Sequence, residues 1–163
     1  MATLSVVKFN KAEGAEEALN KLRGLQQQQL IQIIDAAVVT WPVGRKGPKT
    51  RQAVDTAGMG ALGGGFWGLL FGFLFFLPLL GFALGTAAGA LAGALTDIGI
   101  DDSFIKQARD KITPGTSALF LLSADAVADR VVPELKNLNP ELVATNLSKD
   151  QEAKLRELFA ENQ

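Results

Sequence analysis

The hydrophobic and polar positions near the amino terminus follow first the period of a strand and then that of an amphipathic helix. Residues 3–9 are rich in Val, Phe and Thr, which predicts a β-strand. Asn10 and Glu13 have the spacing of a capping box, and the apolar residues after them recur at helical spacing. We therefore expect a helix over about 11–27.

Apolar runs of strand type continue on both sides of a long stretch without charges. Residues 30–43 are apolar on both faces for most of their length and predict a buried strand, followed by a Gly/Pro turn and a polar strand near 50–54. Further along the chain, residues 117–122 predict a buried strand and residues 142–147 a short one.

Helical patterns separate these later strands. Asp101 is placed to cap a helix over 102–112, whose apolar residues share one face. Another helix is predicted to start at Ser123 and to be kinked or restarted at Pro133. A Ser-x-x-Gln capping box that begins at Ser148 opens the last predicted helix.

The order of these elements predicts the fold class. Strands alternate with helices without the regular long spacing of a parallel sheet, so we expect an α+β sandwich of the ferredoxin-like kind. We divide the chain into residues 1–55, the first half of this domain; 56–96, an inserted apolar helical hairpin; and 97–163, the second half.

The inserted segment is defined by its lack of charge. No Asp, Glu, Lys or Arg occurs in the 41 residues from Thr56 to Thr96, which hold eleven of the seventeen glycines and six of the ten phenylalanines. We expect two helices, over about 57–76 and 79–95, joined near Pro78.

Glycines recur every fourth residue in both predicted helices. Such a row leaves a groove without side chains, into which a second helix can pack closely. The predicted helix-packing residues are Gly60, Gly64, Gly68, Gly72, Gly81, Gly85, Gly89 and Gly93. The residues predicted to face lipid or neighbouring subunits are Phe66, Trp67, Phe71, Phe73, Phe75, Phe76, Leu79, Leu80 and Phe82.

This composition favours lipid or a closely packed assembly. Each glycine costs a water-exposed helix about 1 kcal/mol relative to alanine, whereas in lipid an unpaired backbone costs more and the helix persists. Membrane insertion, a soluble oligomer with buried hairpins and a buried hairpin in a monomer are the alternatives, in that order of preference. Insertion is either a full two-pass hairpin or a shallow one that places the Phe/Leu tip in one leaflet.

Residues with basic side chains flank the segment. Arg45, Lys46, Lys49 and Arg51 precede it and are candidates for contact with anionic lipid headgroups, although a solvated surface explains them equally well. Placed by the positive-inside rule, they predict a membrane protein with both termini and the soluble domain in the cytoplasm.

Composition also excludes several functions. The formal net charge is -1, which argues against nucleic acid as a partner. The chain has no Cys and no His, so it lacks the usual nucleophile–base pairs and offers a metal only oxygen ligands. We read the adjacent Asp101 and Asp102 as a helix cap, and Asp55 and Asp97 as polar ends of the hairpin rather than as cation ligands. We expect no catalytic residue, cofactor or metal site, and therefore no enzyme.

Three stretches resemble a known family. The glycine-patterned segment, GIDDSFIKQARDKI (Gly99–Ile112) and TPGTSALFLL (Thr113–Leu122) resemble the DUF1269 family of uncharacterised predicted membrane proteins. This resemblance implies the architecture but brings no established activity. We therefore expect a structural or stress-related protein, anchored in a membrane and self-associating through the hairpin. The alternative is an oligomeric ligand-binding module that forms a shell or pore.

Overall fold

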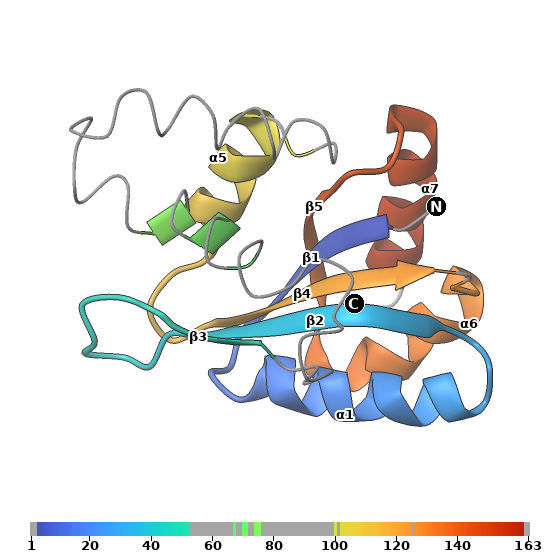
Figure 1. Cartoon of the computed structure of the whole chain (residues 1–163), viewed down its shortest axis with the longest axis horizontal. Helices are drawn as coiled ribbons and strands as arrows, with labels where there is room; N and C mark the ends of the chain where they lie inside the picture. Colours follow the sequence, from blue (N-terminus) through green and yellow to red (C-terminus); the bar gives the residue numbers. More distant parts are fainter. Residues whose placement is uncertain are drawn as a thin grey trace.

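The computed structural model describes residues 3–52, 67, 70–71, 74–75, 100, 102–124 and 126–161 (Figure 1). In these residues the chain is α+β, with one five-stranded sheet. The strands are β1 (Thr3–Phe9), β2 (Gln32–Thr40), β3 (Lys49–Gln52), β4 (Ser117–Ala124) and β5 (Glu141–Thr145). The helices are α1 (Gly14–Gln27), α5 (Asp102–Lys111), α6 (Ala128–Val131), the 3-10 helix η2 (Val132–Leu138) and α7 (Lys149–Glu161).

The strand order in the sheet is β3-β2-β4-β1-β5, and every neighbouring pair is antiparallel. The central strand β4 pairs along its length with β1 on one side and β2 on the other. Thr3 lies opposite Ser123, and Ala37 lies opposite Phe120. The halves on either side of the charge-free segment therefore interleave in a single sheet.

Alternating side chains give the sheet two apolar faces. On one face, Leu4, Val6 and Phe120 pack with α5 and with the helical residues Trp67, Leu70, Phe71 and Leu74. We call this the insert face. On the other face, Val7, Leu119 and Leu121 pack against α1, α6, η2 and Phe159 of α7, and we call it the α1 face. Figure 1 shows α1 and α5 on opposite sides of the sheet.

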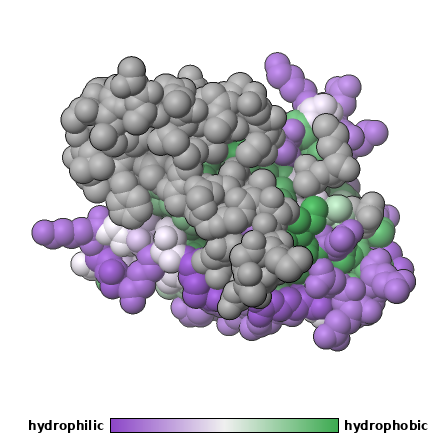
Figure 2. Space-filling view, viewed as in Figure 1, coloured by the Kyte–Doolittle hydropathy of each residue, from purple (hydrophilic) through white to green (hydrophobic). Residues whose placement is uncertain are grey.

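The distribution of hydrophilic and hydrophobic residues on the surface follows the arrangement of the helices and the sheet. Figure 2 shows hydrophilic side chains along the lower rim, where α1 lies, and at the left, where the β2–β3 hairpin projects. The hydrophobic residues visible in this view gather in the middle, over the sheet. Five apolar side chains of α1, which recur at helical spacing and include Leu19 and Leu22, turn inward and are buried.

Most predicted elements are confirmed, some with shifted ends. The strand over 3–9 is found as predicted, and the helix predicted over 102–112 ends one residue earlier. One half of the capping box of the last helix is present: the N–H of Gln151 donates to the hydroxyl of Ser148 at 3.4 Å. That hydroxyl in turn donates to the side-chain oxygen of Gln151 at 3.2 Å.

Two local predictions are wrong. Ser123 does not start a helix but continues β4, because it pairs with Thr3 of β1 and Ile33 of β2. The helix after it begins only at Ala128. The capping box at Asn10 does not form either, since α1 begins at Gly14 with Glu13 as N-cap and without a side-chain cap.

Candidate functional site

An aromatic cluster joins the charge-free segment to the sheet. Trp67 and Phe71 are stacked, with ring centroids 5.9 Å apart, and Phe71 stacks in turn on Phe75 at 6.1 Å. Phe120, which projects from β4, meets Phe71 edge-on at 5.1 Å and Trp67 at 6.5 Å. Aromatic pairs at these distances stabilise a core beyond the area they bury. We call Trp67, Phe71, Phe75 and Phe120 the aromatic cluster.

The spacing of these rings explains why one side of the segment meets the sheet. Residues four apart lie on the same face of a helix, so Trp67, Phe71 and Phe75 form one row. From α5, the Nε of Arg109 donates to the carbonyl oxygen of Leu74 at 3.2 Å. This bond ties the end of the row to the domain.

Two residues predicted to face lipid or neighbouring subunits lie elsewhere. Trp67 and Phe71 are buried in the chain's own core, at 3% and 4% exposure, because Phe120 offers them an aromatic partner. Phe75 is only partly buried, at the edge of that core. The other predicted lipid-facing residues and all eight predicted helix-packing glycines lie outside the described residues, as do Asp55, Asp97 and Asp101.

A basic hairpin projects beside the aromatic cluster. It connects β2 to β3 and carries Arg45, Lys46, Lys49 and Arg51, all of which are exposed. Arg51 forms an ion pair with Glu16 of α1. The predicted headgroup contacts therefore lie together on one hairpin, with Arg45 and Lys46 in its loop and Lys49 and Arg51 on β3.

The same hairpin exposes an apolar residue at its tip. The side chain of Val43 is 84% exposed, between Trp41 and Arg45. Trp41 packs partly against the core of the insert face, and its indole N–H donates to the carbonyl of Arg45 at 3.0 Å. The backbone of Trp41 bonds to Gly115 and to Thr116, which fixes the base of the hairpin. A firmly held loop thus presents valine among cations, a combination suited to the surface of an anionic bilayer.

Among the residues that the structure describes, no helix is both long and apolar enough to span a membrane. The same ranges contain no group of three or more acidic side chains that could hold a metal ion.

Comparison with known proteins gives one match. The family model described as "Protein of unknown function (DUF1269)" matches residues 61–160, which is more than half of the chain. The chain belongs to the DUF1269 family. Neither the curated proteins nor the solved structures contain a significant match.

The DUF1269 match divides the described domain unevenly. It begins within the charge-free segment and includes α5, β4, α6, η2, β5 and nearly all of α7. The strands β1, β2 and β3, the helix α1 and the basic hairpin lie outside it. The aromatic cluster falls wholly within the part that resembles the DUF1269 family.

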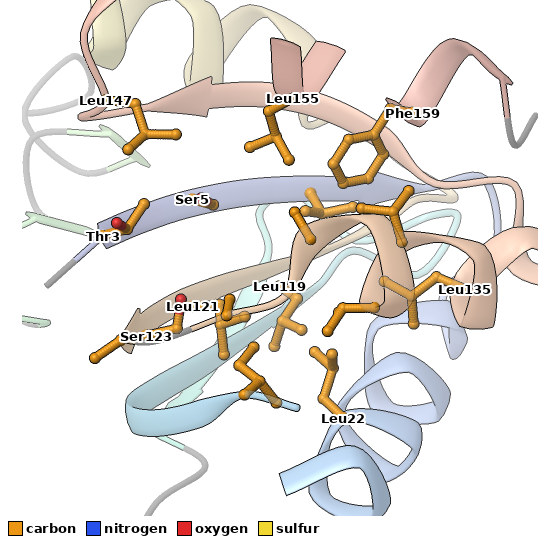
Figure 3. A pocket seen from close by; sticks show the side chains of 17 residues that line it. Thr3, Ser5, Leu22, Leu119, Leu121, Ser123, Leu135, Leu147, Leu155 and Phe159 are labelled. Atoms are coloured by element: carbon orange, nitrogen blue, oxygen red, sulfur yellow. The ribbon is translucent and has the colours of Figure 1, made fainter. Parts of the chain in front are cut away.

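The described domain also contains a pocket, formed by residues both inside and outside the DUF1269 match, that the sequence did not reveal. It lies on the α1 face, has a volume of about 320 Å³ and is bounded by β1, β4, η2 and α7 (Figure 3). Its walls are mainly aliphatic, with hydroxyl groups of Thr3, Ser5 and Ser123 toward one end. The signal that could have found it is the run of small residues at Ala124, Ala126 and Ala128, which leaves space beside larger neighbours.

A buried carboxylate in β2 was missed as well. Asp35 is fully buried, and its carboxylate accepts the N–H of Ala36 at 2.8 Å. It lies at a register irregularity between β2 and β4, next to Leu122. The surrounding apolar run predicted a buried strand but no role for this residue.

Proposed function

We propose that this DUF1269 protein is a non-enzymatic, membrane-associated structural protein that anchors and self-associates through its charge-free segment. The carrying observation is the stretch of 41 residues without a charged side chain, joined to a domain whose basic hairpin exposes Val43. In this proposal the hairpin meets anionic headgroups, and both termini and the soluble domain lie in the cytoplasm.

The aromatic cluster supports shallow insertion over a two-pass hairpin. The first predicted leg, residues 57–76, includes Trp67 and Phe71, which pack against Phe120. A leg held on the sheet as far as Phe71 cannot cross the hydrocarbon at the same time. The 21 uncharged residues from 76 to 96 are then the part that contacts lipid or other copies of the chain.

We also propose that the domain is ferredoxin-like. Without β3, the sheet order is β2-β4-β1-β5. This order interleaves β1-α1-β2 with β4-α6-β5, each helix crossing over a strand from the other half, as in a split βαβ fold. The strand β3 and the charge-free segment are then additions between the second and third strands of that fold.

Vesicle flotation tests the membrane proposal. The full chain is expected to float with vesicles of phosphatidylcholine, and more completely when phosphatidylglycerol is included. The triple substitution Arg45→Gln, Lys46→Gln and Lys49→Gln should reduce binding to the anionic vesicles at least tenfold, because each cation near the surface contributes about 1 kcal/mol. A matched triple on the opposite part of the domain, Arg130→Gln, Lys149→Gln and Lys154→Gln, should bind like the parent.

Two outcomes would contradict this proposal. One is a monodisperse species of 17.3 kDa in plain buffer that ignores both vesicle types. The other is release of ions from loaded vesicles by a defined ring of subunits, which would favour the pore alternative.

The glycine rows are tested by a substitution matched within the chain. Gly85→Leu and Gly89→Leu should reduce the size of the assembly, because overpacking of a close helix contact typically costs about 1–3 kcal/mol. Gly24→Leu is the control, since a Cβ at Gly24 in α1 meets nothing within 4 Å. If all three variants assemble like the parent, the glycines do not form a packing interface.

A further inference from the structure

The pocket on the α1 face has the features of a ligand site rather than of a packing defect. Its volume of about 320 Å³ lies within the range of small-molecule sites. It lies next to a well-formed core, which includes the fully buried Leu19 and Leu22 of α1. Apolar space left empty in a core is destabilising, and apolar cavities of about 150 Å³ already bind small hydrocarbons.

The residues that line the pocket make one of its ends polar but uncharged. None of the described lining residues carries a charge, so an ionic group inside the pocket would lose its hydration without gaining a counter-ion. Ser123 is only 6% exposed, and its hydroxyl makes no hydrogen bond within the part of the chain that the structure describes. Thr3 lies directly opposite it on β1, and its side chain is equally unbonded there. A serine and a threonine thus offer donors and acceptors at the same end of the pocket.

A long and mainly aliphatic wall runs along β4 from the polar end of the pocket to the other end. Ser123, Leu121 and Leu119 are successive inward residues of β4, so this wall extends over about 13 Å at ~3.3 Å per residue. Figure 3 shows the hydroxyl groups of Thr3 and Ser123 at one end, and Leu135 and Phe159 toward the other. A wall of that length accommodates an extended chain of roughly eight to ten carbons. The small side chain of the exposed Ala126 stands at the rim.

We propose that this pocket binds a single-chain aliphatic alcohol or a similar uncharged amphiphile, with its polar head at Thr3 and Ser123. The chain lies along Leu119 and Leu121, between β4 and Leu135. A carboxylate or ammonium head of the same length is rejected because no side chain in the described lining neutralises it. The inference is independent of the membrane proposal, since the pocket lies on the opposite face of the sheet from the aromatic cluster.

Methyl NMR on the full chain tests this assignment. The protein, with labelled Leu and Val methyl groups, is titrated with 1-octanol, in nanodiscs of long-chain phospholipid if it floats with vesicles and in plain buffer if it does not. Methyl signals of Leu121, Val132 and Leu135 should shift and saturate. Signals of Leu4, Val6 and Leu122, which belong to the same sheet but face the insert side, should stay in place. Octanoate at neutral pH should bind at least tenfold more weakly.

Two variants separate ligand binding from nonspecific partitioning. Ala128→Leu should fill the pocket and abolish the saturable shifts, while Ala153→Leu on the exposed side of α7 should leave them unchanged. Ser123→Val keeps the shape and removes the hydroxyl, so the affinity for 1-octanol should fall about three- to tenfold. Ser123→Val decides the question if Ala128→Leu fails to fold.

The proposal is overturned by any of four results. These are the absence of saturable shifts, equal shifts on both faces of the sheet, equal binding of octanoate and octanol, and parental octanol affinity in folded Ala128→Leu or Ser123→Val.

Discussion

The hydroxyl group of Ser117 in β4 accepts the backbone N–H of Ala15 in the first turn of α1, at 2.9 Å. It also donates to the carbonyl oxygen of Lys11 at 2.6 Å. Ser117 is completely buried, and α1 has no side-chain cap of its own. A serine more than one hundred residues away in sequence therefore supplies the cap that the start of this helix needs.

The first prediction concerns this long-range cap. Ser117→Ala should lower the free energy of unfolding by about 1–3 kcal/mol, because it leaves the buried N–H of Ala15 without its acceptor. The carbonyl of Lys11 loses one bond but keeps the N–H of Gly14 as a donor. Ser148→Ala removes the exposed cap of α7 and should cost less, about 0.5–1 kcal/mol. Chemical denaturation followed by circular dichroism gives both values. Equal losses of unfolding free energy in the two variants would mean that the burial of Ser117 does not make its cap more stabilising than an exposed one.

The second prediction compares two glycines of α1. At Gly14 a Cβ would lie 2.5 Å from the Cβ of Phe9, so Gly14→Ala should destabilise the domain by about 1–3 kcal/mol. At Gly24 a Cβ meets open space, and Gly24→Ala should stabilise the helix by about 0.5–1 kcal/mol. Thermal unfolding of the two variants should thus shift in opposite directions. A shift in the same direction would refute the close approach of α1 to β1.

The third prediction tests the aromatic cluster. A double-mutant cycle of Phe71→Leu and Phe120→Leu should give a coupling free energy of about 0.5–1.5 kcal/mol, since the rings meet edge-on at 5.1 Å. Phe75 contacts Phe71 only at the edge of the core, so a Leu there has a smaller effect than one at Phe71. The free energies of unfolding of the parent, the two single variants and the double variant supply the cycle, and that of Phe75→Leu supplies the comparison. If the losses of unfolding free energy from Phe71→Leu and Phe120→Leu are additive, the charge-free segment does not pack against the sheet at these rings.

The fourth prediction concerns the attachment of α7 to the edge of the sheet. The guanidinium of Arg156 donates to the carbonyl oxygens of Leu142 at 2.8 Å and Val143 at 3.3 Å, and to Glu152 at 2.9 Å. Arg156→Lys cannot keep this fork, so amide exchange in α7 should accelerate about fivefold, a loss of about 1 kcal/mol. Lys154→Gln, at an exposed position on the same helix, should leave exchange unchanged.

Periodicity predicted the strands and helices of the domain well, because their apolar residues alternate or recur on one face. It did not predict the end of β4, since Ser123 and Ala124 have a helix-start composition and become strand only through pairing with β1 and β2. The cap from Ser117 was missed for the same reason, as it depends on contacts between distant parts of the chain.

In the candidate sites, too, local sequence patterns predicted some features, whereas others depend on contacts between distant parts of the chain. The row of Trp67 and Phe71 indicated an apolar helix face, but the identity of its partner, Phe120, depends on the tertiary fold. The pocket arises where small residues from β1, β4 and the loop after β4 converge. The alanines at 124, 126 and 128 mark one wall in the sequence, but their approach to β1 depends on the tertiary fold. The four basic residues of the hairpin were recognisable because they are close together in the sequence.

The interleaved order of the strands has a consequence during synthesis. The central strand β4, which both β1 and β2 require, follows the charge-free segment in the chain. At roughly 5–20 residues per second, the segment leaves the ribosome seconds before the sheet can close. Phe120, the ring that covers Trp67 and Phe71, is also made after them. For that interval the nascent chain presents these aromatic side chains to lipid, to a chaperone or to another copy before its own core exists.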